Sequence, residues 1–104
     1  MYRYNTSFSV EQGHISEWME YMQQTFIPKV QAYEAFTNGT LLRVDAAPQQ
    51  GYRMFAFQVE VEKLIHIKKW QRQLQKEIEQ EIRTLFDDKV LFFSSILEEI
   101  PLNK

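Results

Sequence analysis

The spacing of hydrophobic residues along this chain alternates between the two periods that distinguish strands from helices. They repeat at every second residue in residues 2–10, 37–46 and 52–61, and residues 90–97 form a short apolar run, all typical of strands. After the first and third of these segments the spacing changes to three or four residues, which is typical of helices. The resulting order predicts an α+β, ferredoxin-like β-α-β-β-α-β fold, with two helices on one face of a four-stranded antiparallel sheet.

The first helical segment begins near His14 and carries a single stripe of large side chains, namely Ile15, Trp18, Met19, Met22 and Phe26. We interpret this stripe as core packed on the sheet, because helical spacing of apolar residues is typical of a buried face. The alternative, an aromatic and methionine-rich pocket, requires a gap below Trp18. Pro28 is expected to end or kink the helix and to favour an extended backbone at Ile27.

The second helical segment covers about residues 62–86 and contains neither Gly nor Pro. Its expected core stripe is Ile67, Trp70, Leu74, Ile78, Ile82 and Leu85. The sequence APQQG, residues 47–51, predicts a turn, so the strands on either side of it are expected to pair as an antiparallel hairpin.

The last strand is apolar on both faces, with Val90, Phe92 and Ile96 on one face and Leu91, Phe93 and Leu97 on the other. Two helices can cover only one face of the sheet. We therefore expect a homodimer in which a second copy of the sheet covers the other face. The length of 104 residues agrees with one domain, residues 1–104, that has little capacity to bury more surface within itself.

Polar residues occupy the second face of the first strand, which is expected to be central in the sheet. Arg3, Asn5 and Ser7 should lie on the face away from the helices, near Tyr52 and Gln58. Such groups must find partners or water when the face is covered. Two interpretations stay open: a hydrogen-bonded dimer interface, or a cavity between the sheets where a small molecule binds, for instance an anion facing Arg3. The candidate ligand-binding residues are Arg3, Asn5, Ser7, Tyr52 and Gln58.

Composition argues against several classes of function. A net charge of −2 gives no field that would attract nucleic acid or an anionic membrane, and neither is expected as a partner. The chain has no signal-peptide pattern and no apolar run of about 20 residues, so we expect a soluble, cytoplasmic protein. Because the chain lacks Cys, has only two His and has no glycine-rich phosphate loop, we expect neither a metal site nor a cofactor.

Lys68, Arg72 and Lys76 are spaced to form a basic ridge on the second helical segment. Like charges at this spacing weaken a helix slightly. The ridge is either a solvated face or a surface for an anion or an acidic partner, and both interpretations stay open.

Four stretches of the chain resemble the small bacterial family known as domain of unknown function 4286: YNTSFSV, EWMEYMQQTFIPKV, LLRV and FFSSILEEI. The resemblance implies a ferredoxin-like fold similar to dimeric α+β barrels, a group that includes antibiotic-biosynthesis-type monooxygenases and ligand-sensing domains. It implies no activity. Trp18 and Tyr21 agree with the family pattern, whereas Phe26 stands where a histidine is common, which indicates a packing position.

These observations favour a homodimeric binding or interaction module with a small-molecule cavity between its sheets as an open possibility. The alternative is a small monooxygenase-like enzyme that uses the same cavity. No catalytic residue can be assigned from the sequence, because no triad or comparable arrangement of nucleophile and base is evident.

Overall fold

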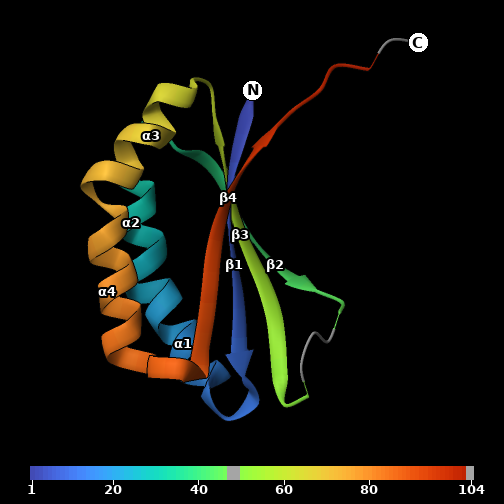
Figure 1. Cartoon of the computed structure of the whole chain (residues 1–104), viewed down its shortest axis with the longest axis vertical. Helices are drawn as coiled ribbons and strands as arrows, with labels where there is room; N and C mark the ends of the chain where they lie inside the picture. The colour runs from blue at the N-terminus through green and yellow to red at the C-terminus, as the bar shows by residue number, and fades with distance from the viewer. Residues whose placement is uncertain (47–49, 103–104) are drawn as a thin grey trace.

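The computed structural model describes residues 1–46 and 50–102 as one layer of helices packed on one sheet (Figure 1). The strands are β1 (Tyr2–Glu11), β2 (Thr37–Val44), β3 (Tyr52–Val61) and β4 (Val90–Glu98). They form an antiparallel sheet in the order β2-β3-β1-β4. The helices are α1 (Ile15–Tyr21), α2 (Ile27–Gln31), α3 (Leu64–Gln73) and α4 (Gln75–Phe86), and all lie on one side of the sheet. The predicted ferredoxin-like α+β fold is confirmed, and β1 and β3 are central.

The first helical segment is longer than the sequence predicted. A π-helical turn, Met22–Phe26, joins α1 to α2, and the helix continues past Pro28 to Gln31. The helix does not end at Pro28, and the alternative, a kink there, stays a prediction. The extended backbone expected at Ile27 is wrong, because its φ of −61° and ψ of −45° are helical. The irregular turn lies just before Pro28, which then occupies the first turn of α2, where a missing N–H is tolerated.

The second helical segment is not the single helix that was predicted for residues 62–86. It begins at Leu64 and is divided at Leu74, whose φ of −120° and ψ of −29° are not helical. After this break Ile78, Ile82 and Phe86 face the sheet at a spacing of four residues. Leu85, predicted as core, is instead 57% exposed, because the new phase of α4 places Phe86 inward.

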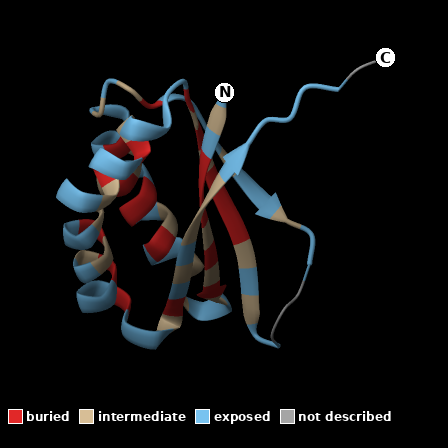
Figure 2. Cartoon of the chain, turned by 45° about the horizontal axis from the view of Figure 1, so that its top comes forward, coloured by how far each residue is buried: buried red, intermediate tan, exposed pale blue. Residues whose placement is uncertain are grey.

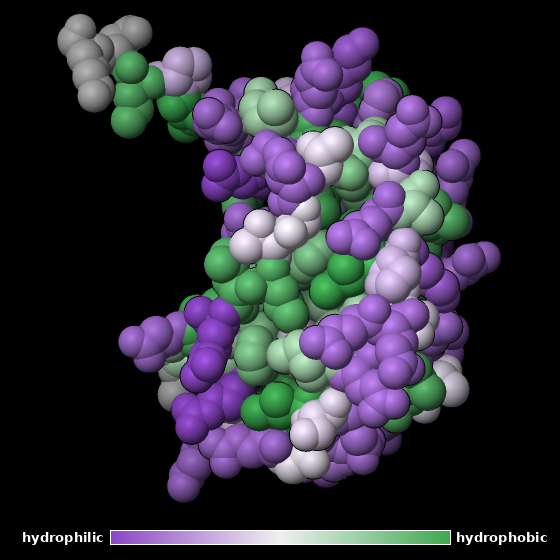
Figure 3. All heavy atoms as spheres, turned by 180° about the vertical axis from the view of Figure 1, so that it is seen from behind, coloured by the Kyte–Doolittle hydropathy of each residue, from purple (hydrophilic) through white to green (hydrophobic). Residues whose placement is uncertain are grey.

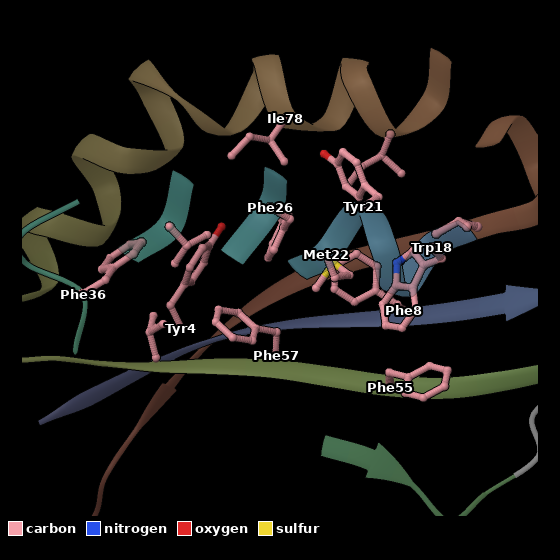
Figure 4. Packing of buried hydrophobic residues seen from close by; sticks show 14 of the residues in the cluster. Tyr4, Phe8, Trp18, Tyr21, Met22, Phe26, Phe36, Phe55, Phe57 and Ile78 are labelled. Atoms are coloured by element: carbon pink, nitrogen blue, oxygen red, sulfur yellow. The ribbon is translucent and has the colours of Figure 1, made fainter. Parts of the chain in front are cut away.

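The core lies between the helices and the sheet, where aromatic rings from both layers meet (Figures 2 and 4). The ring centroid of Trp18 is 5.2 Å from that of Phe8 and 4.7 Å from that of Phe55. Phe26 is buried and makes edge contacts with Phe8 and Phe57. The core interpretation is therefore confirmed for Trp18, Met22 and Phe26, which are buried, whereas Ile15 and Met19 are only partly buried against the core.

Strand pairing follows the predicted alternation of faces. In the β2–β3 hairpin Leu41 is opposite Phe57, whereas Leu42 is opposite Ala56 on the other face. The antiparallel hairpin is confirmed, although the first three residues of the turn predicted at 47–51 lie outside the described residues. Gly51 ends the described part of this turn with φ of 84°, a backbone conformation that favours glycine.

Among the described residues, no helix is both apolar enough and long enough to cross a membrane.

Candidate functional site

The face of the sheet that no helix covers, which we call the bare face, has a polar centre. Asn5 on β1 is directly opposite Gln58 on β3 and Ser95 on β4. Its amide nitrogen donates to the Ser7 hydroxyl at 3.0 Å, and its amide oxygen accepts a hydrogen bond from Gln58 at 3.2 Å. Although no helix lies above it, Asn5 is only 8% exposed. Neighbouring side chains on the bare face therefore enclose this amide and bond its oxygen and one of its N–H groups.

Large apolar side chains surround the polar centre. The exposed ones are Leu42 on β2 and Leu91, Phe93 and Leu97 on β4. Phe93 is 61% exposed. Viewed from behind, the outline of the molecule is hollow below the C-terminal tail, and hydrophobic side chains gather around this hollow (Figure 3). The bare-face side chains Leu91, Phe93 and Leu97 of β4 thus present an apolar surface to solvent in the single chain.

Large and small side chains on the bare face create a local hollow. It has a volume of about 300 Å³ and is lined by Ser7, Phe8, Ser9, Met54, Leu91, Phe92 and Phe93. The two serines of β1 lie next to larger side chains of β4, because Ser7 is opposite Phe93 and Ser9 is opposite Leu91. An exposed aromatic ring and a depression therefore adjoin one another on the same face.

The structure brings together three of the five predicted ligand-binding residues. Asn5, Ser7 and Gln58 are joined by hydrogen bonds, and Arg3 lies one position further along the same face, opposite Glu60 and Leu97. Tyr52 is at the other end of the sheet, opposite Glu11, eight residues along β1 from Arg3. This offset corresponds to roughly 27 Å, so one small ligand cannot contact both Arg3 and Tyr52.

The C-terminal tail extends the bare side of the molecule. The backbone nitrogen of Glu99 donates to the Met1 carbonyl at 3.0 Å, and the chain then leaves the sheet on the side opposite the helices (Figure 1). Ile100 and Leu102 are 75% and 84% exposed. These two apolar side chains lack a packing surface within the described part of the chain.

A second candidate region lies inside the molecule, between the helices and the sheet. Here the Tyr4 hydroxyl donates to Gln75, whose amide nitrogen donates to Glu79 at 3.0 Å. The hydroxyls of Thr6 and Ser94 are 3.1 Å apart. These groups adjoin aromatic side chains that include Phe36, Phe57, Trp70 and Phe92. Burial raises the pKa of Tyr4, so its phenol stays protonated and can donate.

This internal cavity was not predicted from the sequence. Its only signal was the presence of hydroxyl residues, Thr6 and Ser94, on strand faces that are otherwise apolar. The cavity volume is about 30 Å³. Because one water molecule needs roughly 10–15 Å³, the cavity has room for at most two or three waters and not for an aromatic substrate.

The remaining pairs of titratable side chains connect different secondary-structure elements. Tyr21 on α1 donates to Glu81 on α4 at 2.9 Å, and burial together with this carboxylate raises the pKa of Tyr21. Glu11 lies 3.1 Å from Lys89 and 3.0 Å from His14. The interaction with Lys89 lowers the pKa of Glu11 below its usual range, and the hydrogen bond from His14 adds to this effect. These contacts join the ends of β1, α1 and α4.

Metal ligation was tested around both histidines. In residues 1–46 and 50–102 no three or more His, Asp or Glu side chains are grouped so as to hold a metal ion. His14 contacts the Glu11 carboxylate at 3.0 Å. The basic ridge residues Lys68, Arg72 and Lys76 are exposed on α3 and α4. The absence of a cofactor stays a prediction.

Solved structures with the same architecture have little sequence in common with this chain. A dimeric ferredoxin-like protein from an uncultured marine organism has a TM-score of 0.65 at 6% identity, covering 100% of this chain and 99% of its own. An ethyl tert-butyl ether d (EthD) family protein from Bacillus halodurans has a TM-score of 0.65 at 13% identity, covering 96% and 100%. A Deinococcus radiodurans protein named as a candidate antibiotic biosynthesis monooxygenase has a TM-score of 0.63 at 13% identity, covering 100% and 97%. At these identities the likeness establishes the fold alone.

No curated protein matches the chain. The sequence profile described as Domain of unknown function (DUF4286) matches residues 1–100, nearly the whole length. The chain belongs to the DUF4286 family.

Proposed function

We propose that this protein is a homodimeric interaction module in which two copies of the bare face pack against each other. The observation that carries this proposal is the exposed apolar surface of β4, centred on Phe93, beside a satisfied and nearly buried amide, Asn5. Contiguous apolar surface on a sheet face is typical of a protein interface. The oxygen and one N–H of this amide are already hydrogen-bonded, so a partner can cover these two groups without leaving them unpaired.

A second copy fits this surface better than an unrelated partner does. In a two-fold symmetric interface the same patch is used by both subunits, so it must be self-complementary. The Phe93 ring and the hollow over Ser7 and Ser9 lie side by side on one face. A two-fold axis between the sheets allows each Phe93 to enter the hollow of the other subunit. Two of the similar solved structures are described as dimeric ferredoxin-like proteins, which supports a homodimer.

The monooxygenase-like alternative has weaker support. Similar structures include proteins named as candidate antibiotic biosynthesis monooxygenases, but a shared fold does not carry an activity with it. The cavity beneath the helices is too small for an aromatic substrate, and a cavity between sheets exists only if the dimer forms.

Ligand binding by Arg3, Asn5, Ser7 and Gln58 stays a prediction, as do the cytoplasmic location and the single domain over residues 1–104.

The decisive experiment compares two exposed side chains by size-exclusion chromatography with light scattering and by native mass spectrometry. Phe93→Asp places a charge in the proposed interface, and Leu85→Asp places the same charge at a comparably exposed position on α4. We expect the unaltered protein and Leu85→Asp to be dimers and Phe93→Asp to be a monomer with an unchanged circular dichroism spectrum. A monomeric unaltered protein, or a dimeric Phe93→Asp variant, would contradict the proposal.

A further inference from the structure

A groove lies on the helix side of the sheet, at the edge where β2 approaches α1. It has a volume of about 460 Å³, within the range of small-molecule sites. Its lining residues are Ile15, Met19, Arg43, Val44, Asp45, Ala46, Arg53 and Phe55. The groove is separate from the bare face and from the internal cavity, and none of its residues belongs to the ligand set predicted from the sequence.

One part of the groove wall is apolar. Ile15 and Met19 are only partly buried, although both pack against the core. Phe55 has a buried ring that forms the inner wall, since its other contact is with Trp18. An apolar ligand body placed here would cover the exposed parts of these side chains and lose its own contact with water.

Two arginines flank the inner wall. Arg43 on β2 is directly opposite Phe55, and Arg53 precedes Phe55 by two residues on β3. They are therefore diagonal neighbours on one sheet face, with backbones roughly 7–8 Å apart. Long guanidinium side chains at this separation can reach a common anion.

Neither guanidinium has a carboxylate within ion-pair distance in the described part of the chain. The ion pairs there join Glu11 to Lys89 and His14, and Glu81 to Lys29. Residues 47–49, which follow the last lining residue in the sequence, are Ala, Pro and Gln and carry no charge. Asp45 also lines the groove, so two formal positive charges face one negative charge. This balance suits a ligand with a single negative charge.

We infer that this groove binds a small monocarboxylate with an apolar body, its carboxylate held by Arg43 and Arg53 and its body packed against Met19 and Phe55. Arginine recognises carboxylates by paired hydrogen bonds, and the apolar walls select against small hydrophilic anions such as acetate. The inference is independent of the proposed dimer, because the groove uses the opposite side of the sheet.

The test is an NMR titration of the full-length, isotopically labelled protein with 3-phenylpropionate and with the uncharged 3-phenylpropanamide. We expect the carboxylate to shift amide resonances around Arg43, Arg53 and Met19. The amide should bind at least about tenfold more weakly, because it loses charge-assisted hydrogen bonds. The double variant Arg43→Gln/Arg53→Gln should weaken carboxylate binding by about tenfold or more.

Lys68→Gln/Arg72→Gln is the matched control, since it also removes two positive charges, both from exposed positions on α3. Binding by this variant should equal that of the unaltered protein. Equal affinity for carboxylate and amide would overturn the inference. So would unchanged binding by the double variant, absence of binding, or shifts confined to the bare face or the internal cavity. Loss of the dimer in Phe93→Asp should leave this titration unchanged.

Discussion

The two faces of the sheet use the same strands but meet different surroundings. Phe92 and Phe93 are consecutive residues of β4 with the same side chain. Phe92 packs against the core and lies 6.4 Å from Phe8 between ring centroids, whereas Phe93 is 61% exposed. On β1, Phe8 is fully buried under the helices while Ser7 forms part of a hollow on the bare face. Most aromatic side chains on the helix-covered face are packed within the chain, whereas the large apolar side chains of β4 on the bare face are exposed.

The largest expected effect is on the helix-covered face. Trp18→Ala should lower the free energy of unfolding by about 3–5 kcal/mol, because it empties the space between Phe8 and Phe55. Trp18→Phe should cost clearly less, since the ring is kept and the lost indole N–H has no hydrogen-bond partner among the described residues. Urea denaturation measures both. A cost for Trp18→Ala of less than about 1 kcal/mol would show that this face is loosely packed.

The matching change on the bare face is Phe93→Ala. It should alter the stability of the isolated monomer by less than about 0.5 kcal/mol, because the side chain is exposed there. It should weaken dimer formation by about 2 kcal/mol, as expected for an aromatic residue at the centre of an interface. Sedimentation equilibrium and denaturation at several protein concentrations separate these quantities. A large loss of monomer stability would remove the distinction between the two faces.

The polar centre of the bare face should give a smaller effect. Gln58→Ala removes the donor to the Asn5 amide oxygen and should cost about 1 kcal/mol, since that oxygen is shielded from water. The cost should rise when the protein is concentrated enough to dimerise, because the unpaired oxygen is then fully buried. Gln73→Ala, at an exposed position on α3, should be neutral by the same denaturation assay. Equal costs in dilute and concentrated protein would argue against burial of Asn5 in a dimer.

Between the helices, Tyr21→Phe should cost about 1 kcal/mol by loss of the hydrogen bond to Glu81. Burial and Glu81 raise the pKa of Tyr21 above its ordinary value of 10.0. The unfolded chain therefore loses this proton first as the pH rises above 10.0, and the stabilisation is lost with increasing pH. The difference in unfolding free energy between the two proteins should shrink in this alkaline range. A constant difference across that range would contradict the assignment.

The smallest effect is expected at the exposed end of β1. Lys89, and then His14, lower the pKa of Glu11 below its ordinary value of 4.5. The stabilisation is therefore complete above pH 4.5 and is lost as the pH falls through the lowered pKa. Glu11→Gln should flatten this acid dependence in thermal unfolding, and added salt should reduce the difference, because the pair is exposed to solvent. Glu17→Gln, an exposed carboxylate on α1, serves as control.

Much of the fold could be predicted because strand faces obey a strict period of two. The sides taken by Leu41, Leu42, Phe92 and Phe93 all follow from alternation. Helix phase was less predictable. A break at Leu74 moves Phe86 inward and Leu85 outward, and nothing in the local sequence, which lacks Gly and Pro there, marks the break. Nothing in the sequence indicated that the first helix continues past Pro28, because this continuation depends on the π-helical turn before it.

The candidate sites likewise include residues whose positions could be predicted from the sequence and residues whose positions could not. Grouping of Asn5, Ser7 and Gln58 follows from alternation together with the central positions of β1 and β3. The remote position of Tyr52 depends on the strand register, which the sequence did not specify. The Arg43–Arg53 groove was missed because the two residues are joined across a strand pair, and their neighbour Met19 comes from a helix.

Local periodicity determined the elements of this protein, their order and the two apolar faces of β4, because backbone geometry alone sets which residues share a face. The tertiary structure decided which of those faces is covered and which unpaired charges come together. It also decided where the helices break and how little space remains between the layers. These properties depend on how side chains distant in the sequence fit against one another, and packing of that kind leaves no periodic signal along the chain.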